Sequence, residues 1–418
     1  MAINLDFKQT YLGAIPSDWS LEKFKDVTNL ITCGVAATPK YANESTGRPF
    51  LSAQNVQNGR VVFENFRFID KELFIQLTKH NKPSRGDILY TRVGAAIGEA
   101  GIIESDLEFA IYVSLTLIKV RKNKLNSSFL SHLLNSDRCR LMAKGGQFAG
   151  GGVQNLNVEI VREFPIPIPS LPEQQSIATA LSDADAYIES LERLITKKRD
   201  LKKGVIQELL KPNSNWHHTT LLALCDGRKD LFDDGDWIES EHITEKGIRL
   251  IQTGNIGLGR YLEKTDKKYI YEKSYDLLNC KSLQVGDLLI CRLAEPAGRG
   301  CILPNIGEDR IITSVDVTIC RPLSHNADRR FLAQYFTTDM WLRLVSDRSG
   351  GTTHKRIARG SLGSIKFEVP DVKIQTEIAD ILCDIDTDIT THEEKLYKAR
   401  LIKQGMMQAL LTGRIRLV

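Results

Sequence analysis

The sequence lacks the short motifs that mark a catalytic or nucleotide-binding site. It contains no G-x-G-x-x-G and no G-x-x-x-x-G-K-[ST] segment, which excludes the usual dinucleotide-binding and nucleotide-binding loops. It also lacks the Asp/Asn-Pro-Pro-aromatic run that is typical of adenine-specific amino-methyltransferases. We therefore expect no catalytic residues and no cofactor bound by this chain.

Cysteine is present, but not at the spacings of metal sites or disulfide frameworks. The eight cysteines include no C-x-x-C pair, and none is spaced as a metal ligand with the eight histidines. Scattered free thiols are typical of proteins in a reducing compartment. We expect a cytoplasmic protein without a bound metal.

Long apolar segments are also missing. No run approaches the ~18–20 apolar residues that a membrane span needs, and the first ten residues lack the apolar core of a signal peptide. The net charge of +4 is mildly basic, which permits nucleic-acid binding without indicating it. The length of 418 residues predicts two or three domains in a soluble, intracellular protein.

The most regular pattern in the sequence is that of a long helix, which we expect between Pro169 and Leu210. Pro172 and Glu173 suit the first turn, because proline loses no helical hydrogen bond there and the helix dipole favours an anion. The apolar residues that follow recur with the alternating spacing of four and three that is typical of a coiled coil. At about 1.5 Å per residue the helix is roughly 55–60 Å long, so it needs a partner helix.

A second copy of this helix provides the partner. A shift of 201 positions aligns Pro370–Leu411 without a gap, and 16 of the 42 positions are identical, against roughly two or three expected by chance. We predict an antiparallel pair, because two copies of one unit close most simply about a pseudo-two-fold axis; a parallel pair is the alternative. The residues predicted to line the contact between the helices are Ile177, Leu181, Ile188, Leu191, Ile378, Leu382, Ile389 and Leu396.

The duplication extends to the segments that precede each helix. GDILYTR at 86–92 matches GDLLICR at 286–292, and short β-branched runs alternate with turn residues in both copies. The predicted fold class is α+β, with two pseudo-symmetric globular domains separated by an antiparallel pair of long coiled-coil helices. The predicted boundaries are 1–167 for the first domain, 168–211 for the first helix, 212–368 for the second domain and 369–418 for the second helix.

On these features the sequence resembles the specificity subunit of type I restriction–modification systems. LPEQQ at the start of the first helix, the paired helix near the end and the closing QALLTGRIRL carry the resemblance, which covers nearly the whole chain. The second half departs from the pattern, because KIQTEIA at 373–379 stands where LPEQQ is expected.

The resemblance implies two target-recognition domains, each binding one half of a bipartite site in double-stranded DNA. The helices would set the gap between the half-sites and dock two methyltransferase subunits, and restriction/translocase subunits would complete the complex. S-adenosylmethionine, ATP and magnesium are then implied for the partner subunits, while this chain is expected to be non-catalytic. A single-chain site-specific nuclease and a scaffold that does not bind DNA are the competing interpretations.

The candidate DNA contacts are matched arginines and two glycine-rich segments. One arginine pair follows a glycine, and a second pair ends a predicted strand, where an internal salt bridge is the alternative. The glycine-rich segments 144–157 and 348–361 precede the helices, where a flexible hinge is the alternative; glycine permits a close backbone approach, and neighbouring side chains can hydrogen-bond to bases. The predicted DNA-binding residues are Arg60, Arg92, Gln147, Gln154, Asn155, Arg260, Arg292, His354, Lys355 and Arg356.

A basic run also occurs on the first helix, between Lys197 and Lys203. A solvated helix face is the default interpretation of such a run. Contact with DNA phosphates or with a methyltransferase subunit is the alternative.

Overall fold

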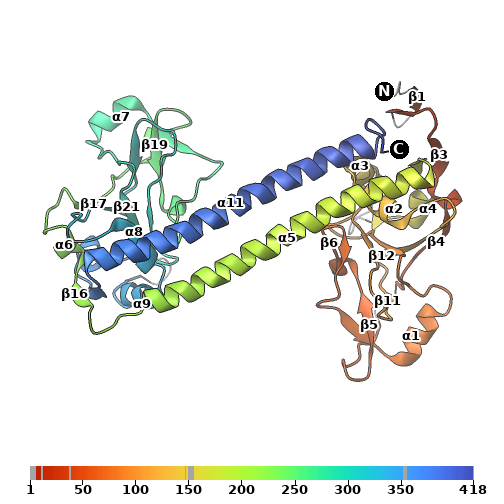
Figure 1. Ribbon diagram of the computed structural model, residues 1–418, viewed down its shortest axis with the longest axis horizontal. Coiled ribbons are helices and arrows are strands. Elements are labelled where there is room, and N and C mark those ends of the chain that lie inside the picture. The colour runs from red at the N-terminus through yellow and green to blue at the C-terminus, as the bar shows by residue number, and fades with distance from the viewer. Residues whose placement is uncertain are drawn as a thin grey trace. The chain divides into compact units, whose positions relative to one another are not determined.

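The computed structural model describes residues 6–10, 13–36, 39–145, 147–148, 155–351 and 355–417, without the side chains of residues 147 and 148. The chain divides into two compact units: Met1–Glu192 with Glu394–Val418, and Arg193–Glu393. Two 39-residue helices, α5 (Leu171–Leu209) and α11 (Val372–Leu410), confirm the predicted long helices (Figure 1). The boundary between the units falls within both helices, so each unit holds one globular domain and a part of each helix.

In the described residues, the globular domain of the first unit contains two larger sheets, three two-stranded sheets and four α-helices. The strands are β1 (Phe7–Thr10), β2 (Gly13–Pro16), β3 (Ser20–Lys23), β4 (Thr28–Cys33), β5 (Arg48–Leu51), β6 (Val56–Gln57), β7 (Arg60–Val61), β8 (Arg67–Ile69), β9 (Ile88–Thr91), β10 (Ala100–Ile102), β11 (Ala110–Ile111), β12 (Leu115–Val120), β13 (Gln147–Phe148), β14 (Asn155–Leu156) and β15 (Pro165–Ile168), and the helices are α1 (Lys71–Thr78), α2 (Ser127–Leu134), α3 (Asp137–Gly145) and α4 (Val158–Arg162). The main sheet has the order β4-β12-β9-β10-β7-β6, and a smaller sheet has the order β11-β5-β8.

The central strand β9 explains how the main sheet is covered on both faces. Its alternate residues point to opposite faces, so Ile88 and Tyr90 join a core with α2 and α3, while Leu89 joins a core with the smaller sheet. All four residues of β9 are buried. A strand was predicted within GDILYTR at 86–92, and this prediction is confirmed.

The globular domain of the second unit repeats this arrangement. Its strands are β16 (His217–Thr219), β17 (Phe232–Asp234), β18 (Ile243–Thr244), β19 (Ile248–Ile251), β20 (Lys268–Ile270), β21 (Leu288–Cys291), β22 (Gly300–Ile302), β23 (Ile311–Thr313), β24 (Val317–Cys320) and β25 (Phe367–Val369), and its helices are α6 (Leu221–Leu224), α7 (Glu272–Leu277), α8 (Arg329–Tyr335), α9 (Asp339–Ser346) and α10 (Arg359–Gly363). The order β17-β24-β21-β22 matches β4-β12-β9-β10, and the order β20-β19-β23 matches β8-β5-β11. The predicted α+β class and its duplication are therefore confirmed.

A buried glutamine joins the first domain to the start of α5. The side-chain oxygen of Gln174 accepts a hydrogen bond from the backbone N–H of Asn126 (2.8 Å), at the start of α2. Its amide nitrogen donates to the carbonyl oxygens of Lys124 and Pro169 (both 3.0 Å). Because Gln174 is completely buried, removing it would leave these backbone groups without partners in a region that water does not reach.

The same joint is present in the second domain. Gln375 is also completely buried, accepts from the backbone N–H of Asp328 (3.0 Å) and donates to the carbonyl of Pro370 (2.8 Å). The glutamine shared by LPEQQ and KIQTEIA is thus an internal joint. The residues around this glutamine differ between the two motifs, and one of the differences is that the exposed Ile374 stands in the second helix where the buried Glu173 stands in the first.

Ion pairs between α5 and α11 set their direction and register. They are Asp185–Lys403 (2.5 Å) and Glu192–Arg400 (2.7 Å) in the first unit, and Lys202–Asp386 (2.7 Å), Arg199–Glu393 and Lys198–Asp388 in the second. Residue numbers rise along α5 as they fall along α11, so the segments are antiparallel in each unit, as predicted. A shift of 201 converts Asp185–Lys403 into Asp386–Lys202, so the same register is specified twice. Partly exposed pairs stabilise by about 1 kcal/mol or less each, and their main effect is on register.

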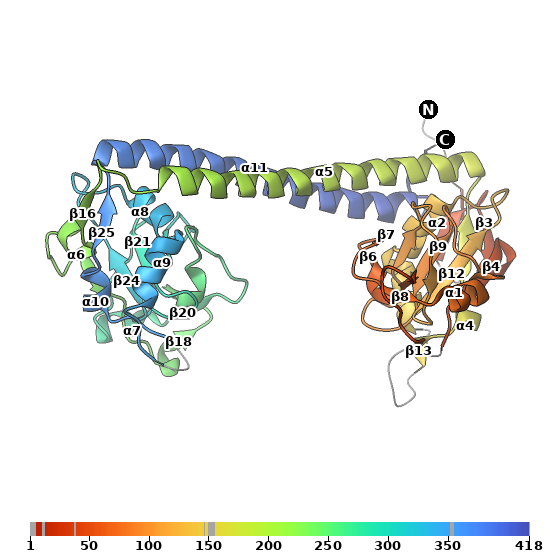
Figure 2. The same ribbon diagram turned by 90° about the horizontal axis from the view of Figure 1, so that it is seen from below.

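The eight residues predicted to line the helix contact are all buried or half-buried. Ile177 and Leu181 share the core of the first domain with Leu410, from the far end of α11. In the second unit, Ile378 and Leu382 share a core with Leu210 and residues of α8 and α9. The ends of the helix contact are therefore continuous with the domain cores. In each unit α2 or α8 lies against the long-helix segment (Figure 2).

The last residues of the chain complete the first unit. The Arg416 guanidinium contacts Glu173, which also accepts a hydrogen bond from the indole N–H of Trp19 (3.1 Å). Arg416 also pairs with Asp18 (2.7 Å), and this contact holds the pKa of the Asp18 carboxyl below its usual value. Glu173 and Trp19 are almost completely buried. The positive charge of Arg416 therefore offsets the free-energy cost of burying the Glu173 carboxylate.

Replacing Arg416 with Met is expected to destabilise the first unit by about 3–5 kcal/mol, because Glu173 would become an unpaired buried charge. Hydrogen exchange of the segment around Trp19 measures the change. The exposed Arg414→Met variant is the matched control and should have little effect. Adding Glu173→Gln to Arg416→Met should recover much of the loss, since the neutral amide still accepts from Trp19. Equal losses for the Arg414 and Arg416 variants would contradict this assignment.

His132 is a titratable group of the first unit at a position where the second unit has a glutamine. Its ring lies 3.9 Å from the Asp185 carboxylate, and burial lowers its pKa to about 4. At the equivalent place Gln334 donates to Asp386 (3.0 Å). Between the unfolded pKa of about 6.5 and the folded value the unfolded chain binds more protons, so stability falls as the pH falls through this range.

The variant His132→Gln should remove about 2 kcal/mol of the stability difference between pH 7 and pH 5, because the amide does not titrate. Hydrogen exchange of the α2 amides at both pH values provides the measurement. An unchanged difference between the two pH values would show that other groups cause it.

Candidate nucleic-acid interface

The arginines that end the central strands lie inside the domains. Arg92 is 7% exposed and Arg292 is 3% exposed. Their hydrogen bonds are Arg92 Nε to Leu156 O (2.9 Å), Arg92 Nη1 to Val113 O (3.2 Å), Arg292 Nη1 to Ile357 O (3.1 Å) and Arg292 Nη2 to Val315 O (2.6 Å). In both domains the guanidinium ties the end of the glycine-rich segment to the loop before β12 or β24.

This geometry changes the interpretation of Arg92 and Arg292. Both were predicted to contact DNA, with an internal salt bridge as the alternative. Arg292 forms such a salt bridge with Asp234 (3.0 Å), whereas the contacts of Arg92 given above are to backbone carbonyls. The strand-terminal position gave no sign that the side chain turns inward, where backbone carbonyls satisfy its donors. We therefore leave these two arginines out of the proposed DNA contacts and assign them the internal role of anchoring the glycine-rich segments.

The two glycine-rich segments are held at equivalent places. Asn155 pairs with Val93 through an isolated β-bridge, and Arg356 pairs with Leu293 in the same way. Asn155, Lys355 and Arg356 are all exposed. Arg356 also forms an ion pair with Asp316 (2.6 Å). Gln147 lies in β13, but its side chain, together with Gln154 and His354, falls outside the described residues.

Arg60 and Arg260 differ in what they contact. Both are exposed and follow glycines with positive φ, 80° at Gly59 and 69° at Gly259. Arg60 pairs with Glu189 of α5 (2.8 Å), so it links β7 to the long helix. Within the described part of the chain the Arg260 guanidinium has no ion-pair partner, which leaves it available to a phosphate.

Two exposed aromatic residues were missed from the sequence. Tyr41 is 44% exposed and lies beneath the Arg67 guanidinium, 4.3 Å from the ring centroid. Trp237 is 68% exposed and its indole N–H donates to Glu239 (3.2 Å). They lie in the loops that follow the equivalent strands β4 and β17. Isolated aromatics in loops carry no spacing pattern, so only the structure shows that both lie exposed in the corresponding loops of the two domains.

The basic run on α5 is largely used within the helix pair. Lys198, Arg199 and Lys202 pair with carboxylates of α11. Lys203 pairs with Asp200 on its own helix (3.3 Å). These contacts exclude a fully free basic face directed at phosphates, and Lys197 alone of the run has no ion pair among the described residues.

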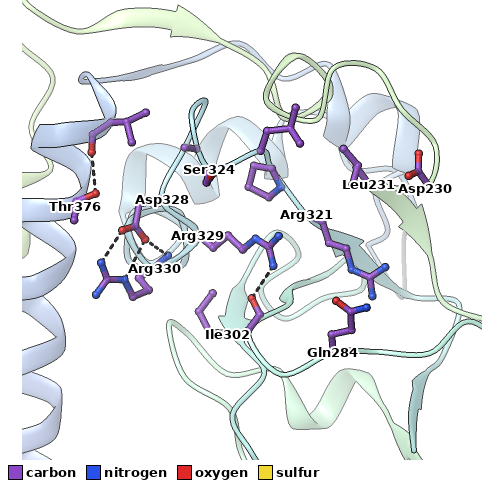
Figure 3. Close-up of a pocket in the computed structure, with 15 residues that line it drawn as sticks. Asp230, Leu231, Gln284, Ile302, Arg321, Ser324, Asp328, Arg329, Arg330 and Thr376 are labelled. Atoms are coloured by element: carbon purple, nitrogen blue, oxygen red, sulfur yellow. Dashed lines mark hydrogen bonds and ion pairs between the residues drawn. The ribbon is translucent and has the colours of Figure 1, made fainter.

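A hollow of about 970 Å³ lies where the second domain meets the start of α11 (Figure 3). Arg330 pairs with Asp328 and Asp380 there, and Arg321 pairs with the buried Asp287. Arg329 donates to a backbone carbonyl across the hollow (3.2 Å). Because the chain itself partners each of these guanidinium groups, the hollow is not an unoccupied anion site.

The described residues contain no group of three or more His, Cys, Asp or Glu side chains that could hold a metal ion. Over the same described ranges, no helix combines the length and the apolar character needed to cross a membrane.

Comparison with known families assigns this duplicated arrangement to a class. The chain matches the type I restriction modification DNA specificity domain over residues 16–198 and 229–399, one match for each half of the repeat. The chain belongs to this family. The resemblance predicted from the sequence, to the specificity subunits of type I restriction–modification systems, is confirmed.

Curated relatives cover nearly the full length. A putative type I restriction enzyme specificity subunit, MjaX, from Methanocaldococcus jannaschii is 24% identical over 430 residues, which is 98% of this chain and 97% of the relative. The EcoKI specificity subunit of Escherichia coli is 23% identical over 430 residues, with 97% and 90% covered.

A solved S subunit from M. genitalium shares the fold, with a TM-score of 0.59, 16% identity and coverage of 98% of this chain and 97% of the other. A chain from a study of type I R-M complex assembly and conformational transition has a TM-score of 0.54 at 15% identity, with coverage of 96% and 99%.

Proposed function

We propose that each globular domain binds one half of a bipartite site in double-stranded DNA. The observation that carries the proposal is one scaffold repeated with different exposed side chains. Asn155 in the first domain stands where Arg356 stands in the second, although the buried arginine anchors beneath them are the same. A shared framework with two different surfaces is suited to recognise two different base sequences.

Within the second domain, Lys355 and Arg260 are the proposed phosphate contacts, because both side chains are exposed cations. Arg356 and, in the first domain, Asn155 are proposed to contact base edges, since guanidinium and amide groups match the donors and acceptors of the major groove. Gln147, Gln154 and His354 remain proposed DNA contacts on sequence grounds.

The paired helices are proposed to set the unrecognised gap between the half-sites and to dock two methyltransferase subunits. Each helix runs for 39 residues without interruption, and duplicated ion pairs hold the pair in one register. In this proposal the chain performs no catalysis. The methyltransferase and restriction/translocase subunits would supply S-adenosylmethionine, ATP and magnesium chemistry.

Substituting Ala for Lys355 or Arg260 should weaken binding to the second half-site and leave the first unchanged. Each lost phosphate contact should lower the dependence of log affinity on log salt concentration by about one unit. Binding titrations at several salt concentrations, with each half-site altered in turn, measure both effects. Lys203→Ala, which removes an exposed cation of α5, is the control. Unchanged affinity and salt dependence for both variants would reject the phosphate assignment.

Adding one helical turn to both helices, at the matched positions Arg193 and Glu394, should lengthen the gap by about one to two base pairs. Both half-site sequences should be unchanged, because the domains are untouched. Methylome sequencing in the host reads the gap directly. The same residues added to the loop at 211–215 serve as the control and should leave the gap as it was. A changed half-site with an unchanged gap would refute the proposed role of the helices.

A further inference from the structure

Most of the positions that are identical in α5 and α11 are used inside the chain. Gln174 and Gln375 form the domain joints, and the matched Asp, Glu, Arg and Lys residues form the ion pairs between the helices. The matched apolar residues fill the cores. Identity at these positions is explained by equivalent internal contacts in the two halves.

Four matched positions form no such internal contact, and they lie close together on each helix. Three of them carry the same residue in α5 and α11, and the fourth carries leucine in one and isoleucine in the other. In each set the first three residues are spaced by four and then three, which places them on one helix face, and the glutamine follows three residues later. They are Lys197, Leu201, Gly204 and Gln207 on α5, here called the α5 surface, and Lys398, Ile402, Gly405 and Gln408 on α11, here called the α11 surface.

Both surfaces are open to solvent. All eight residues are exposed, with Leu201 at 60% and Ile402 at 63%. Over the described residues, the lysine and glutamine side chains of the two surfaces form no ion pair or hydrogen bond. The α5 surface lies wholly in the second unit and the α11 surface wholly in the first. Asp183 and Asp384 are also identical and exposed, but each lies in the other unit from the surface on its own helix.

Gly204 and Gly405 leave open space at the middle of each surface. Glycine within a helix is unfavourable relative to alanine by roughly 0.5–1 kcal/mol, because the unfolded chain loses more freedom. A Cβ atom added at Gly204 or Gly405 would meet nothing within 4 Å, so no contact inside the chain requires glycine. The missing side chain instead leaves space on the outside, where another helix backbone can come close.

We propose that the α5 surface and the α11 surface each bind one helix of the same partner protein, a methyltransferase subunit, with the helices crossing at Gly204 and Gly405. The inference rests on the proposed docking function and specifies its site. Two copies of one surface fit two copies of one partner, because each needs the same complementary shape. Lys197 and Lys398 call for an acidic side chain on the partner helix, and Leu201 and Ile402 for an apolar one beside it.

A size series at the glycines tests the proposal in the full-length chain. The chain is mixed with the methyltransferase subunit of the same restriction–modification system, and complexes are counted by native mass spectrometry. Gly204→Ala should weaken one of two binding events by roughly tenfold and Gly204→Leu by more than about a hundredfold, because a larger side chain keeps the backbones further apart. Gly405→Leu should remove one subunit in the same way, and the double Leu variant should bind none.

Folding is not at risk in these variants, since alanine and leucine favour the helix more than glycine does. The melting temperature of the chain alone should stay level or rise slightly. Lys203→Leu and Gln404→Leu are the matched controls, because they place the same side chain about 100° around each helix from the glycine. Both controls should retain two subunits.

The outcomes separate the inference from the docking function on which it rests. If the unaltered chain binds two subunits and the Leu variants at both glycines also bind two, the proposed surfaces are wrong and docking stands. If Ala and Leu weaken binding equally, the glycines act as helix hinges and the close-approach geometry is rejected. If the unaltered chain binds no methyltransferase subunit, both the docking function and the inference fail.

Discussion

The amide of a buried glutamine is the contact on which each half of the molecule depends. Gln174 and Gln375 satisfy backbone groups of the preceding domain while belonging to the first turn of a long helix. A glutamine can do this because it carries an acceptor and two donors on one planar group. These bonds fix the direction in which each helix leaves its domain, so each domain is held in a set orientation to the start of the helix that follows it.

In both domains, a buried arginine holds the glycine-rich segment in place through contacts that do not involve the exposed side chains of that segment. Arg92 and Arg292 use the same strand end, the same two carbonyl positions and the same bridge to hold segments whose exposed residues differ. Side chains at Asn155 and Arg356 can change without disturbing the buried bonds beneath them. In this arrangement the exposed residues can differ between the two domains while the internal contacts that hold the segments stay the same.

The sequence predicted the parts of the fold that repeat. The two long helices, their antiparallel pairing, the strand at Ile88–Thr91 and the duplication of the domains all follow from periodicity and internal identity. The stretch between Ser127 and Gly145, by contrast, forms two helices, α2 and α3. They are separated at Asn135, whose side chain bonds to both backbone groups of Ala100. Such a break depends on a strand far away in the sequence and leaves no local pattern.

The candidate site was less predictable for the same physical reason. Whether an arginine faces solvent or a buried carbonyl depends on loops that approach it from elsewhere, as at Arg92 and Arg292. Glu173 was interpreted through the helix dipole, yet its charge is balanced by Arg416, 243 positions away. Contacts between exposed residues and DNA are subject to no internal packing constraint, so sequence periodicity does not report them.

The closing of the first unit by the C-terminal residues has a consequence for biosynthesis. Leu410, Leu411 and Arg416 belong to the core and the buried ion pair of a domain whose other residues are translated before the second domain. The second domain and both long helices must emerge before that core can be filled. The first domain is therefore completed after the second, although most of it is translated earlier, and a chain released before residue 410 keeps an unfilled apolar surface that quality-control proteases can detect.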